Sequence, residues 1–199
     1  MISNKKELLE YLQQDAKANK RNAITPRFIG DYIWKFIWYM RHLEYYENLT
    51  GISKLLSKPL AIIYRLKYRQ LSLKLGYSIP LNTFGKGLSI AHVGTIIVNG
   101  NATIGENCRI HDGVTIGSSS GSGEAPQIGD NVFIATGAKL IGDITIANDV
   151  AIGANAVVVK SIKEAGTTWA GVPAKKISDK NSHSNLSPRL FDWWFVRWK

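Results

Sequence analysis

The fold is decided by residues 128–158, which read IGDNVFIATGAKLIGDITIANDVAIGANAVV. An aliphatic residue recurs at every sixth position, and small or polar residues fill the gaps. The grid reaches upstream to residue 104 and comprises Ile104, Ile110, Ile116, Ile128, Ile134, Leu140, Ile146, Ile152 and Val158. Neither the helical period nor the strand period produces this spacing. A fixed six-residue repeat is typical of a parallel β-helix, which we predict over residues 77–177 with three units per triangular turn.

Two different regions flank the repeats, and one segment interrupts them. Residues 1–76 are predicted to be α-helical, with helices over 1–19, about 28–47 and 52–75, the last bent near Pro59. The apolar side of the last helix is predicted to comprise Leu55, Leu56, Leu60, Ile63, Leu66, Leu71 and Leu75. Residues 178–199 form a tail, polar and mobile to 188, then aromatic and basic. Residues 118–127 have no aliphatic side chain larger than alanine, so they should leave the coil as an extruded loop.

The net charge of +10 lies in the flanks: residues 1–76 carry +8, residues 77–174 carry −2 and residues 175–199 carry +4. Basic segments rich in aromatic residues suit a membrane surface, packing within the protein or its oligomer, or exposure to water, and the sequence leaves these alternatives open. Nucleic acid is the least favoured partner, because no nucleic-acid motif accompanies the charge. A single cysteine, Cys108, excludes an internal disulfide framework. Without a signal-peptide core or a long apolar run, we expect a cytoplasmic protein that could touch the inner face of the membrane.

The histidines are the candidate catalytic groups. His92 lies on the six-residue grid, twelve positions before Ile104, where an aliphatic residue is expected. Local rules often fail at functional sites, and imidazole suits general-base chemistry near neutral pH. His111 follows one turn and one residue later, either as a second acid/base or acceptor ligand or as a structural corner residue. His42 is predicted to be structural, and His183 to be solvated.

Three stretches carry a family resemblance: GLSIAHVGTIIVN (87–99), IGDNVFIATGAK (128–139) and AGVPAK (170–175). Residues 79–177 resemble the hexapeptide-repeat acyltransferases, which fold as a left-handed parallel β-helix. The branch that they resemble most is the serine acetyltransferase group, particularly its relatives encoded with capsule and exopolysaccharide genes. The resemblance implies acetyl-CoA as co-substrate, no metal, and a homotrimer with the active site between neighbouring coils. A dimer of trimers is a further option.

The resemblance also implies roles for single residues. His92 would be the catalytic base that takes the proton from an acceptor hydroxyl as it attacks the thioester. The positions that bind acetyl-CoA in the family fall on Thr136, Ala154, Lys160 and Lys175. Thr136 and Ala154 are 18 residues apart, one full turn, so they should stack on one edge. The two lysines could meet the phosphates of CoA as point charges.

The chain departs from the serine branch at the positions that handle an amino acid. An aspartate before the catalytic histidine is Ala91 here, an upstream aspartate is Tyr77, and an Arg-His pair falls on Glu124 and Ala125. Losing these groups removes the obvious salt bridges to an amino-acid substrate. We therefore expect O-acetylation of a sugar hydroxyl in a surface polysaccharide or its lipid-linked precursor, with Glu124 as a possible ligand of sugar hydroxyls. The alternative is serine O-acetylation for cysteine biosynthesis.

Two other classes remain open. A β-helix can serve assembly without catalysis, which loss of activity on replacing His92 would exclude. A metal-dependent hydratase on this fold needs about three imidazole ligands, and only His92 and His111 are well placed.

Overall fold

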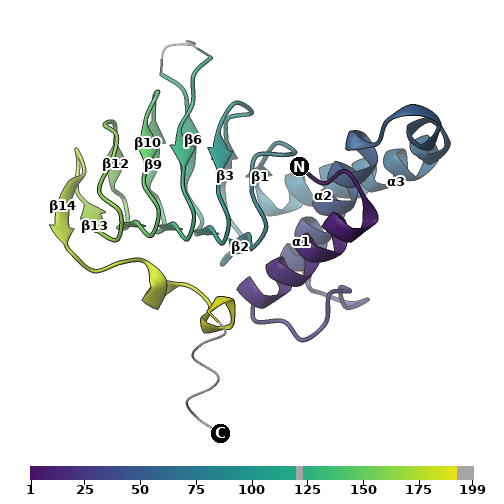
Figure 1. The fold of residues 1–199 in the computed structure, drawn as a ribbon, viewed down its shortest axis with the longest axis horizontal. Coiled ribbons are helices and arrows are strands. Elements are labelled where there is room, and N and C mark those ends of the chain that lie inside the picture. The colour runs from purple at the N-terminus through teal and green to yellow at the C-terminus, as the bar shows by residue number, and fades with distance from the viewer. Residues whose placement is uncertain (120–122, 192–199) are drawn as a thin grey trace, which may run out of the picture.

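The computed structural model describes residues 1–119 and 123–191 and shows a helical region beside a β-helix (Figure 1). The helices are α1 (Lys5–Ala18), α2 (Tyr32–Asn48) and α3 (Gly51–Leu75). The strands are β1 (Tyr77–Ser78), β2 (Ser89–Ile90), β3 (Ile96–Val98), β4 (Thr103–Ile104), β5 (Arg109–Ile110), β6 (Thr115–Gly117), β7 (Gln127–Ile128), β8 (Phe133–Ile134), β9 (Lys139–Ile141), β10 (Thr145–Ile146), β11 (Ala151–Ile152), β12 (Val157–Val158), β13 (Thr168–Ala170) and β14 (Lys175–Ser178). Two short 3₁₀ helices follow, η1 (His183–Asn185) and η2 (Pro188–Leu190).

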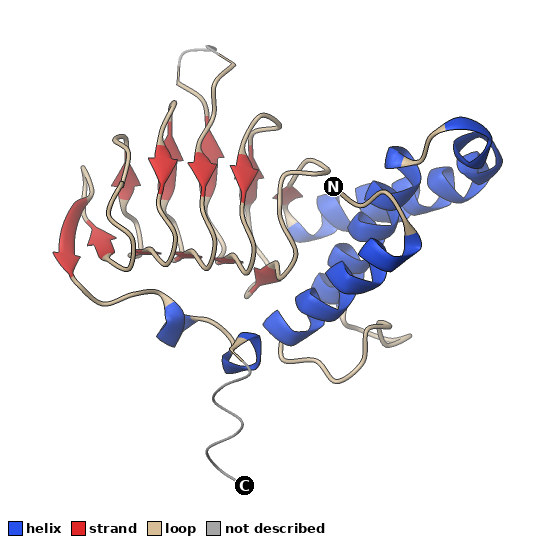
Figure 2. Ribbon diagram, in the orientation of Figure 1, coloured by secondary structure: helices blue, strands red, loops and turns tan. Residues whose placement is uncertain are grey.

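The strands form three sheets, one for each face of a triangular coil (Figure 2). Their orders are β1-β3-β6-β9-β12, β10-β7-β4 and β14-β13-β11-β8-β5-β2. Every strand pair is parallel except β13 with β14, which closes the last coil. The predicted fold class, a left-handed parallel β-helix of hexapeptide repeats with an α-helical N-terminal region, is confirmed.

The strand register explains how the six-residue repeat stays in phase across the inserted segment. Ile134 pairs with Ile152, which is 18 residues and therefore three units further on. Ile110 pairs with Ile134, which is 24 residues further on. The longer turn contains the segment between β6 and β7. Because the insertion adds six residues, one whole unit, the aliphatic positions stay in phase on both sides of it.

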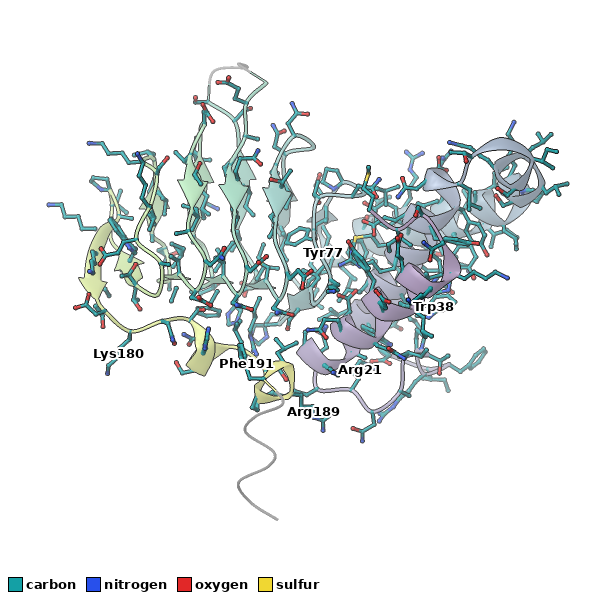
Figure 3. All side chains as sticks on the ribbon, viewed as in Figure 1. Arg21, Trp38, Tyr77, Lys180, Arg189 and Phe191 are labelled. Atoms are coloured by element: carbon teal, nitrogen blue, oxygen red, sulfur yellow. The ribbon has the colours of Figure 1, made fainter. Side chains whose placement is uncertain are left out.

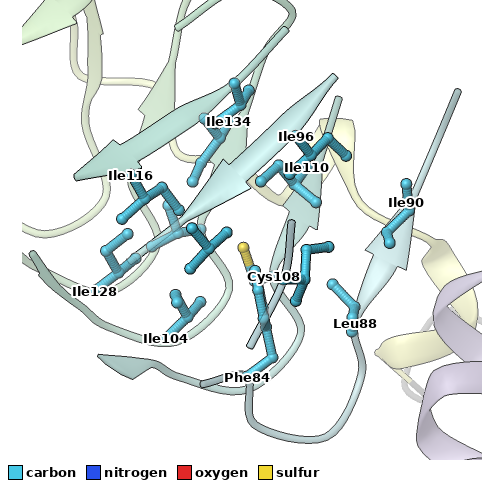
Figure 4. Packing of buried hydrophobic residues seen from close by; sticks show 14 of the residues in the cluster. Phe84, Leu88, Ile90, Ile96, Ile104, Cys108, Ile110, Ile116, Ile128 and Ile134 are labelled. Carbon is cyan, nitrogen blue, oxygen red and sulfur yellow. The ribbon is translucent and has the colours of Figure 1, made fainter. Parts of the chain in front are cut away.

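The aliphatic side chains of the grid fill the axis of the coil (Figure 4). Ile110, Ile116, Ile134, Leu140 and Ile152 have no exposed surface. Burying an aliphatic side chain of this size stabilises a fold by roughly 1.5–3 kcal/mol. The single thiol, Cys108, is buried in the same core, and burial raises its pKa to about 12, so it remains a neutral packing group.

A buried ion-pair network holds the helical region to the first coils. The Arg41 guanidinium of α2 is fully buried and donates from Nε to Asp15 Oδ2 at 2.8 Å and from Nη1 to Glu44 Oε2 at 3.0 Å. Arg41 also donates to the carbonyl oxygens of Phe84 and Gly85, at 3.0 and 2.7 Å.

Asp15 completes this network from α1. Its Oδ1 accepts from the backbone N–H groups of Gly87 and Leu88, at 2.6 and 2.8 Å. Buried charges are tolerated when they are paired and hydrogen-bonded. Two helices are thereby fixed to the chain between β1 and β2.

The helical region corrects two predictions. The aromatic helix begins at Tyr32 rather than near residue 28, because Gly30 and Asp31 adopt positive φ values of 69° and 63°. In α3, only Leu71 and Leu75 of the predicted apolar side are buried. The other members, Leu55, Leu56, Leu60, Ile63 and Leu66, are exposed. The N-terminal part of α3 projects beyond the β-helix (Figure 1).

The C-terminal segment also differs from its prediction. Residues 178–188 are packed rather than mobile, because buried seryl hydroxyls bond to backbone carbonyls: Ser182 to Asn131 and Ser187 to Lys17, the latter at 2.8 Å. His183 is not free in solvent, because its Nε2 lies 2.7 Å from Asp149 Oδ1. The segment thus returns along the β-helix to α1 (Figure 1).

The prediction of an aromatic and basic membrane contact falls mostly on residues 192–199, which lie outside the described part of the chain. Up to Phe191 the tail contacts the protein itself. Arg189 Nη1 donates to the carbonyl oxygen of Arg21 at 3.2 Å, and the two side chains are close together in Figure 3. Among the described helices, none has both the length and the apolar character needed to cross a membrane.

A ladder of side-chain amides crosses the coils. Gln14 Nε2 donates to Asn107 Oδ1, Asn107 Nδ2 to Asn131 Oδ1, and Asn131 Nδ2 to Asp149 Oδ1, each at 2.9 Å. The three coil residues adopt the left-handed conformation, with φ of 58°, 56° and 61°. Asn and Asp tolerate this conformation better than other non-glycine residues, so corner geometry and hydrogen bonding select the same residue types.

Candidate active site

In the structure, His92 does not occupy an inward-facing position of the six-residue repeat. The buried residue of that strand is Ile90, which pairs with Ile110, 20 residues further on. This turn is therefore two residues longer than three units, and His92 lies in the connection between β2 and β3 with its side chain exposed. The prediction that His92 replaces an axial aliphatic residue is wrong. An exposed imidazole is better placed to meet a substrate than an axial one.

The backbone at His92 is held by a buried tyrosine from β1. The Tyr77 hydroxyl donates to the carbonyl oxygen of His92 at 2.7 Å. Burial raises the pKa of Tyr77, with a further contribution from the Asp112 carboxylate, so the phenol stays protonated and keeps donating. Tyr77 therefore orients the loop through its backbone, at the position where the serine branch was expected to have an aspartate.

The two candidate histidines meet edge to face. The ring centroids of His92 and His111 are 5.3 Å apart with an interplanar angle of 90°, and His111 packs against Phe133 in the same manner at 5.1 Å. Arg109 Nε donates to His111 Nε2 at 3.4 Å, which assigns the proton of the neutral imidazole to Nδ1. Burial lowers the pKa of His111, and the nearby Arg109 and His92 lower it further. His111 is thereby kept neutral at neutral pH.

A continuous edge leads away from the histidines along the coil. Gly94 lies against Asp112 so closely that an added Cβ would be 2.8 Å from Asp112 Cβ. The hydroxyl of Thr136 lies 3.1 Å from both the carbonyl oxygen and Oδ2 of Asp112. Ala154 follows one turn beyond Thr136, and both are exposed. Each lies two residues after a strand, and these two strands, β8 and β11, are hydrogen-bonded neighbours. An extended ligand could lie along this edge.

The remaining predicted site residues are less closely connected. Lys160 and Lys175 are exposed near the last coils, and Lys175 starts β14 opposite Ala170. Glu124 is exposed at the foot of the extruded loop and forms no hydrogen bond or ion pair with another described residue. The structure does not join these three side chains to the two histidines.

A cavity adjoins the loop that carries His92. It has a volume of about 370 Å³, and its lining includes Ile90 and Val93, the residues on either side of Ala91 and His92. Its opposite wall holds the Arg21–Asp31 ion pair. Trp34 also lines this cavity, and its buried Nε1 has no hydrogen-bond partner among the described residues.

Sequence reasoning missed several of these contributors. Arg109 and Phe133 each precede an inward isoleucine, so strand alternation places them on the outer face, as it does His111. That alternation was an available signal. The approach of Arg21 and Asp31 to Ile90 depends on how the helices dock, and no local pattern reports it. Within the described residues, no cluster of three or more His, Cys, Asp or Glu could hold a metal ion.

Comparisons with known proteins agree with this architecture. Residues 125–160 match the family model described as bacterial transferase hexapeptide (six repeats). The matched residues lie within the β-helix. A serine acetyltransferase of Staphylococcus epidermidis is 38% identical over 125 residues, which are 57% of this chain and 57% of that protein. One from Staphylococcus aureus is 44% identical over 99 residues, 47% of this chain and 45% of that protein.

A solved structure extends the similarity into the helical region. The serine acetyltransferase of Neisseria gonorrhoeae superposes with a TM-score of 0.64 at 25% identity, covering 87% of this chain and 66% of that chain. The chain spans about half the length of the curated relatives that it matches. The prediction of a sugar acceptor in a surface polysaccharide is wrong, because the relatives and the solved structures are serine acetyltransferases. The missing acidic and Arg-His groups therefore do not exclude an amino-acid acceptor.

Proposed function

We propose that the protein is a serine O-acetyltransferase that uses acetyl-CoA. The observation that carries the proposal is the exposed His92 beside His111, on a coil similar in sequence to serine acetyltransferases. In the reaction the serine hydroxyl oxygen attacks the thioester carbonyl, and His92 accepts the hydroxyl proton. The C–S bond then breaks, and the CoA sulfur leaves and takes up the proton. The products are O-acetylserine and CoA, and no redox partner is needed.

His111 contributes to this step as a neutral neighbour. Its lowered pKa means that it does not place a second positive charge beside the imidazolium that forms on His92. Arg109 holds the ring of His111 in place through Nε2. A general base that removes the proton of a hydroxyl typically contributes about 10²- to 10⁴-fold in rate.

Acetyl-CoA would lie along the edge formed by Asp112, Thr136 and Ala154. Thr136 and Ala154 offer backbone groups one turn apart, and Lys160 and Lys175 supply positive charge near the far coils for the phosphates. This arrangement accords with a homotrimer, in which the groove between subunits is completed by the neighbouring coil. A cytoplasmic location, where acetyl-CoA is available, belongs to the same proposal.

The cavity lined by Ile90 and Val93, in the loop that carries His92, supports an amino-acid acceptor. A zwitterion needs an anion for its ammonium and a cation for its carboxylate. In this proposal the Arg21–Asp31 ion pair opens, so that Asp31 meets the ammonium and Arg21 the carboxylate. The departures at Ala91, Glu124 and Ala125 remove charge from the β-helix side only. The helical region provides charge of both signs in its place.

The test is release of the CoA thiol from acetyl-CoA by purified protein, with L-serine and without an acceptor. We expect turnover that requires serine, and a loss of kcat of about 10²- to 10⁴-fold in His92→Ala. His183→Ala is the matched control, because it removes an imidazole that bonds to Asp149 away from His92, and it should retain kcat. Wild-type protein that folds and binds CoA but does not turn over serine would contradict the proposal. Restored growth of a cysteine-requiring strain provides a second readout.

A further inference from the structure

A further cavity lies in the helical region, away from His92. It has a volume of about 500 Å³ and is lined by the connection before α2 and by facing sides of α2 and α3: Thr25, Pro26, Arg27, Phe28, Tyr32, Lys35, Trp38, Tyr39, Lys67, Gln70, Leu71 and Lys74. We call it the helical cavity. Pockets for small organic ligands usually have volumes of about 300–1,000 Å³ and a largely apolar lining.

The charge around the helical cavity is entirely positive. Arg27, Lys35, Lys67 and Lys74 contribute to its lining, and no acidic residue does. Within residues 1–119 and 123–191, none of these four side chains forms an ion pair with a carboxylate. Four like charges around one concavity repel each other, and a concave site concentrates their field. A bound anion would relieve that repulsion.

The remaining lining is aromatic and apolar. Lys74 Nζ lies 3.8 Å from the centroid of the Tyr32 ring, and Lys35 Nζ lies 5.8 Å from it. Trp38 and Tyr39 pack edge to face at 5.2 Å, and Leu71 adds an aliphatic surface. Aromatic walls favour a flat ligand, while ammonium groups bind phosphate as point charges.

We propose that the helical cavity binds a small organic anion: a phosphate or carboxylate group on a flat, aromatic body. Lys67 and Lys74 of α3 meet the anionic group, and Tyr32 and Trp38 of α2 contact the body. This site is separate from the acetyl-CoA edge, because α3 lies at one end of the β-helix and Lys160 and Lys175 lie towards the other (Figure 1). The inference does not depend on serine being the acceptor.

The test uses 1-naphthyl phosphate as the probe and the intact protein in titration calorimetry. We expect saturable binding by the wild type. Lys67→Gln/Lys74→Gln should weaken the affinity about tenfold or more, the range for losing two charge-assisted contacts. Binding should weaken as salt is added, because exposed charges are screened. Inorganic phosphate and 1-naphthol each lack one half of the ligand, so each should bind at least about tenfold more weakly.

The matched control is Lys58→Gln/Arg69→Gln, which removes the same charge from exposed positions of α3 outside the cavity. It should leave the affinity within about twofold of the wild type. Trp38→Phe should reduce the change in fluorescence on binding but retain most of the calorimetric affinity, which would locate the probe beside Trp38.

Equal weakening by both double variants would overturn the proposal, because binding would then follow net charge alone. Absence of saturable probe binding by folded wild-type protein would also overturn it. So would binding only to phosphatidylglycerol vesicles, which would assign the basic surface to a lipid bilayer instead.

Discussion

The β-helix and the helical region are stabilised in different ways. In the β-helix one contact is repeated: an aliphatic residue packs on its equivalent in the next coil, as Ile110 does on Ile134 and Ile134 on Ile152. The helical region has no such repetition and is attached through unlike contacts: a buried ion-pair network around Arg41, and apolar packing of residues such as Phe36 and Ile37 on the first coils. The first arrangement tolerates an inserted loop, whereas the second depends on a few groups that have no substitutes.

The β-helix thus depends on packing between neighbouring coils, whereas the helical region depends on contacts between residues far apart in the sequence. Stability in a stacked repeat is roughly a sum of local interfaces. A buried ion network is different, because removing one partner leaves the others without compensation. The following substitutions test that contrast, from the largest expected effect to the smallest.

Arg41→Met should have the largest effect. It leaves the buried carboxylates of Asp15 and Glu44 without their cation, at a cost of about 3–5 kcal/mol in the free energy of unfolding. Urea titrations followed by tryptophan fluorescence, to which Trp34 and Trp38 in the helical region contribute, would show the loss. Arg65→Met is the control, because Arg65 is paired with Glu47 at an exposed site and should cost less than about 1 kcal/mol. Equal effects of the two changes would remove the contrast between the regions.

Ile134→Ala tests the repeated core. The side chain has no exposed surface, and truncating such a residue costs about 2–5 kcal/mol. We expect the lower half of that range, because neighbouring coils can move together by small shifts. Val159→Ala, at a position that is 48% exposed, should stay within about 0.5 kcal/mol. A loss in Ile134→Ala greater than that in Arg41→Met would mean that the repeats are the less tolerant region.

Two substitutions of Asn131 distinguish the contribution of backbone strain to stability from that of hydrogen bonding at a corner of the coil. Asn131→Ala loses the ladder bonds and replaces asparagine, which tolerates positive φ, with a residue that disfavours it, so it should cost about 1–3 kcal/mol. Asn131→Gly loses the same bonds without that strain and should cost less. Thermal melts of the two proteins provide the measurement. A glycine variant as unstable as the alanine variant would show that the ladder, not the corner conformation, is what matters.

The smallest expected effect is on the pH dependence of the free energy of unfolding. Burial lowers the pKa of His42, whose ring stacks on Tyr64 at 5.1 Å. The unfolded chain therefore binds the proton more tightly than the folded one. The stability contributed by the neutral ring is fully present above the ordinary histidine pKa, near ~6.5, and is lost as the pH falls below it.

His42→Phe keeps the stacking but removes the titration. Its free energy of unfolding should therefore fall less than that of the wild type between pH 7 and pH 5, measured by urea titration at each pH. His111, whose pKa is also lowered, remains in both proteins and accounts for part of the residual slope. Identical slopes would show that His42 does not contribute.

The sequence predicted the β-helix because each coil repeats the same local rule. It could not predict the corner at His92, where two extra residues move the imidazole from the axis to the surface. It also missed that the polar segment after β14 is packed, since hydroxyl-to-carbonyl bonds such as Ser187 to Lys17 join residues 170 positions apart. Composition reports polarity and does not report such partners.

The prediction of the candidate site was limited in the same way, because contacts between distant segments could not be predicted from the sequence. His92 was predicted from its place on the six-residue grid and from the family resemblance, and His111 from its spacing of one turn and one residue from His92. The acceptor was predicted wrongly from Ala91, Glu124 and Ala125, since the relatives and the solved structures are serine acetyltransferases. Charges at Arg21 and Asp31 reach the loop of His92 through helix docking. A missing charge in one segment does not show that the folded site lacks it.

The amide ladder has a direction as well as a position. The side-chain amides of Gln14, Asn107 and Asn131 each donate towards the C-terminal coils, and Asn107 and Asn131 each accept from the side of α1. The amide dipoles therefore add, and their positive ends point to the carboxylate of Asp149. An amide reversed at any rung would set like poles against each other at the rungs on either side. The single carboxylate at the end thus sets the orientation of three uncharged groups, the farthest of them in a different region of the protein.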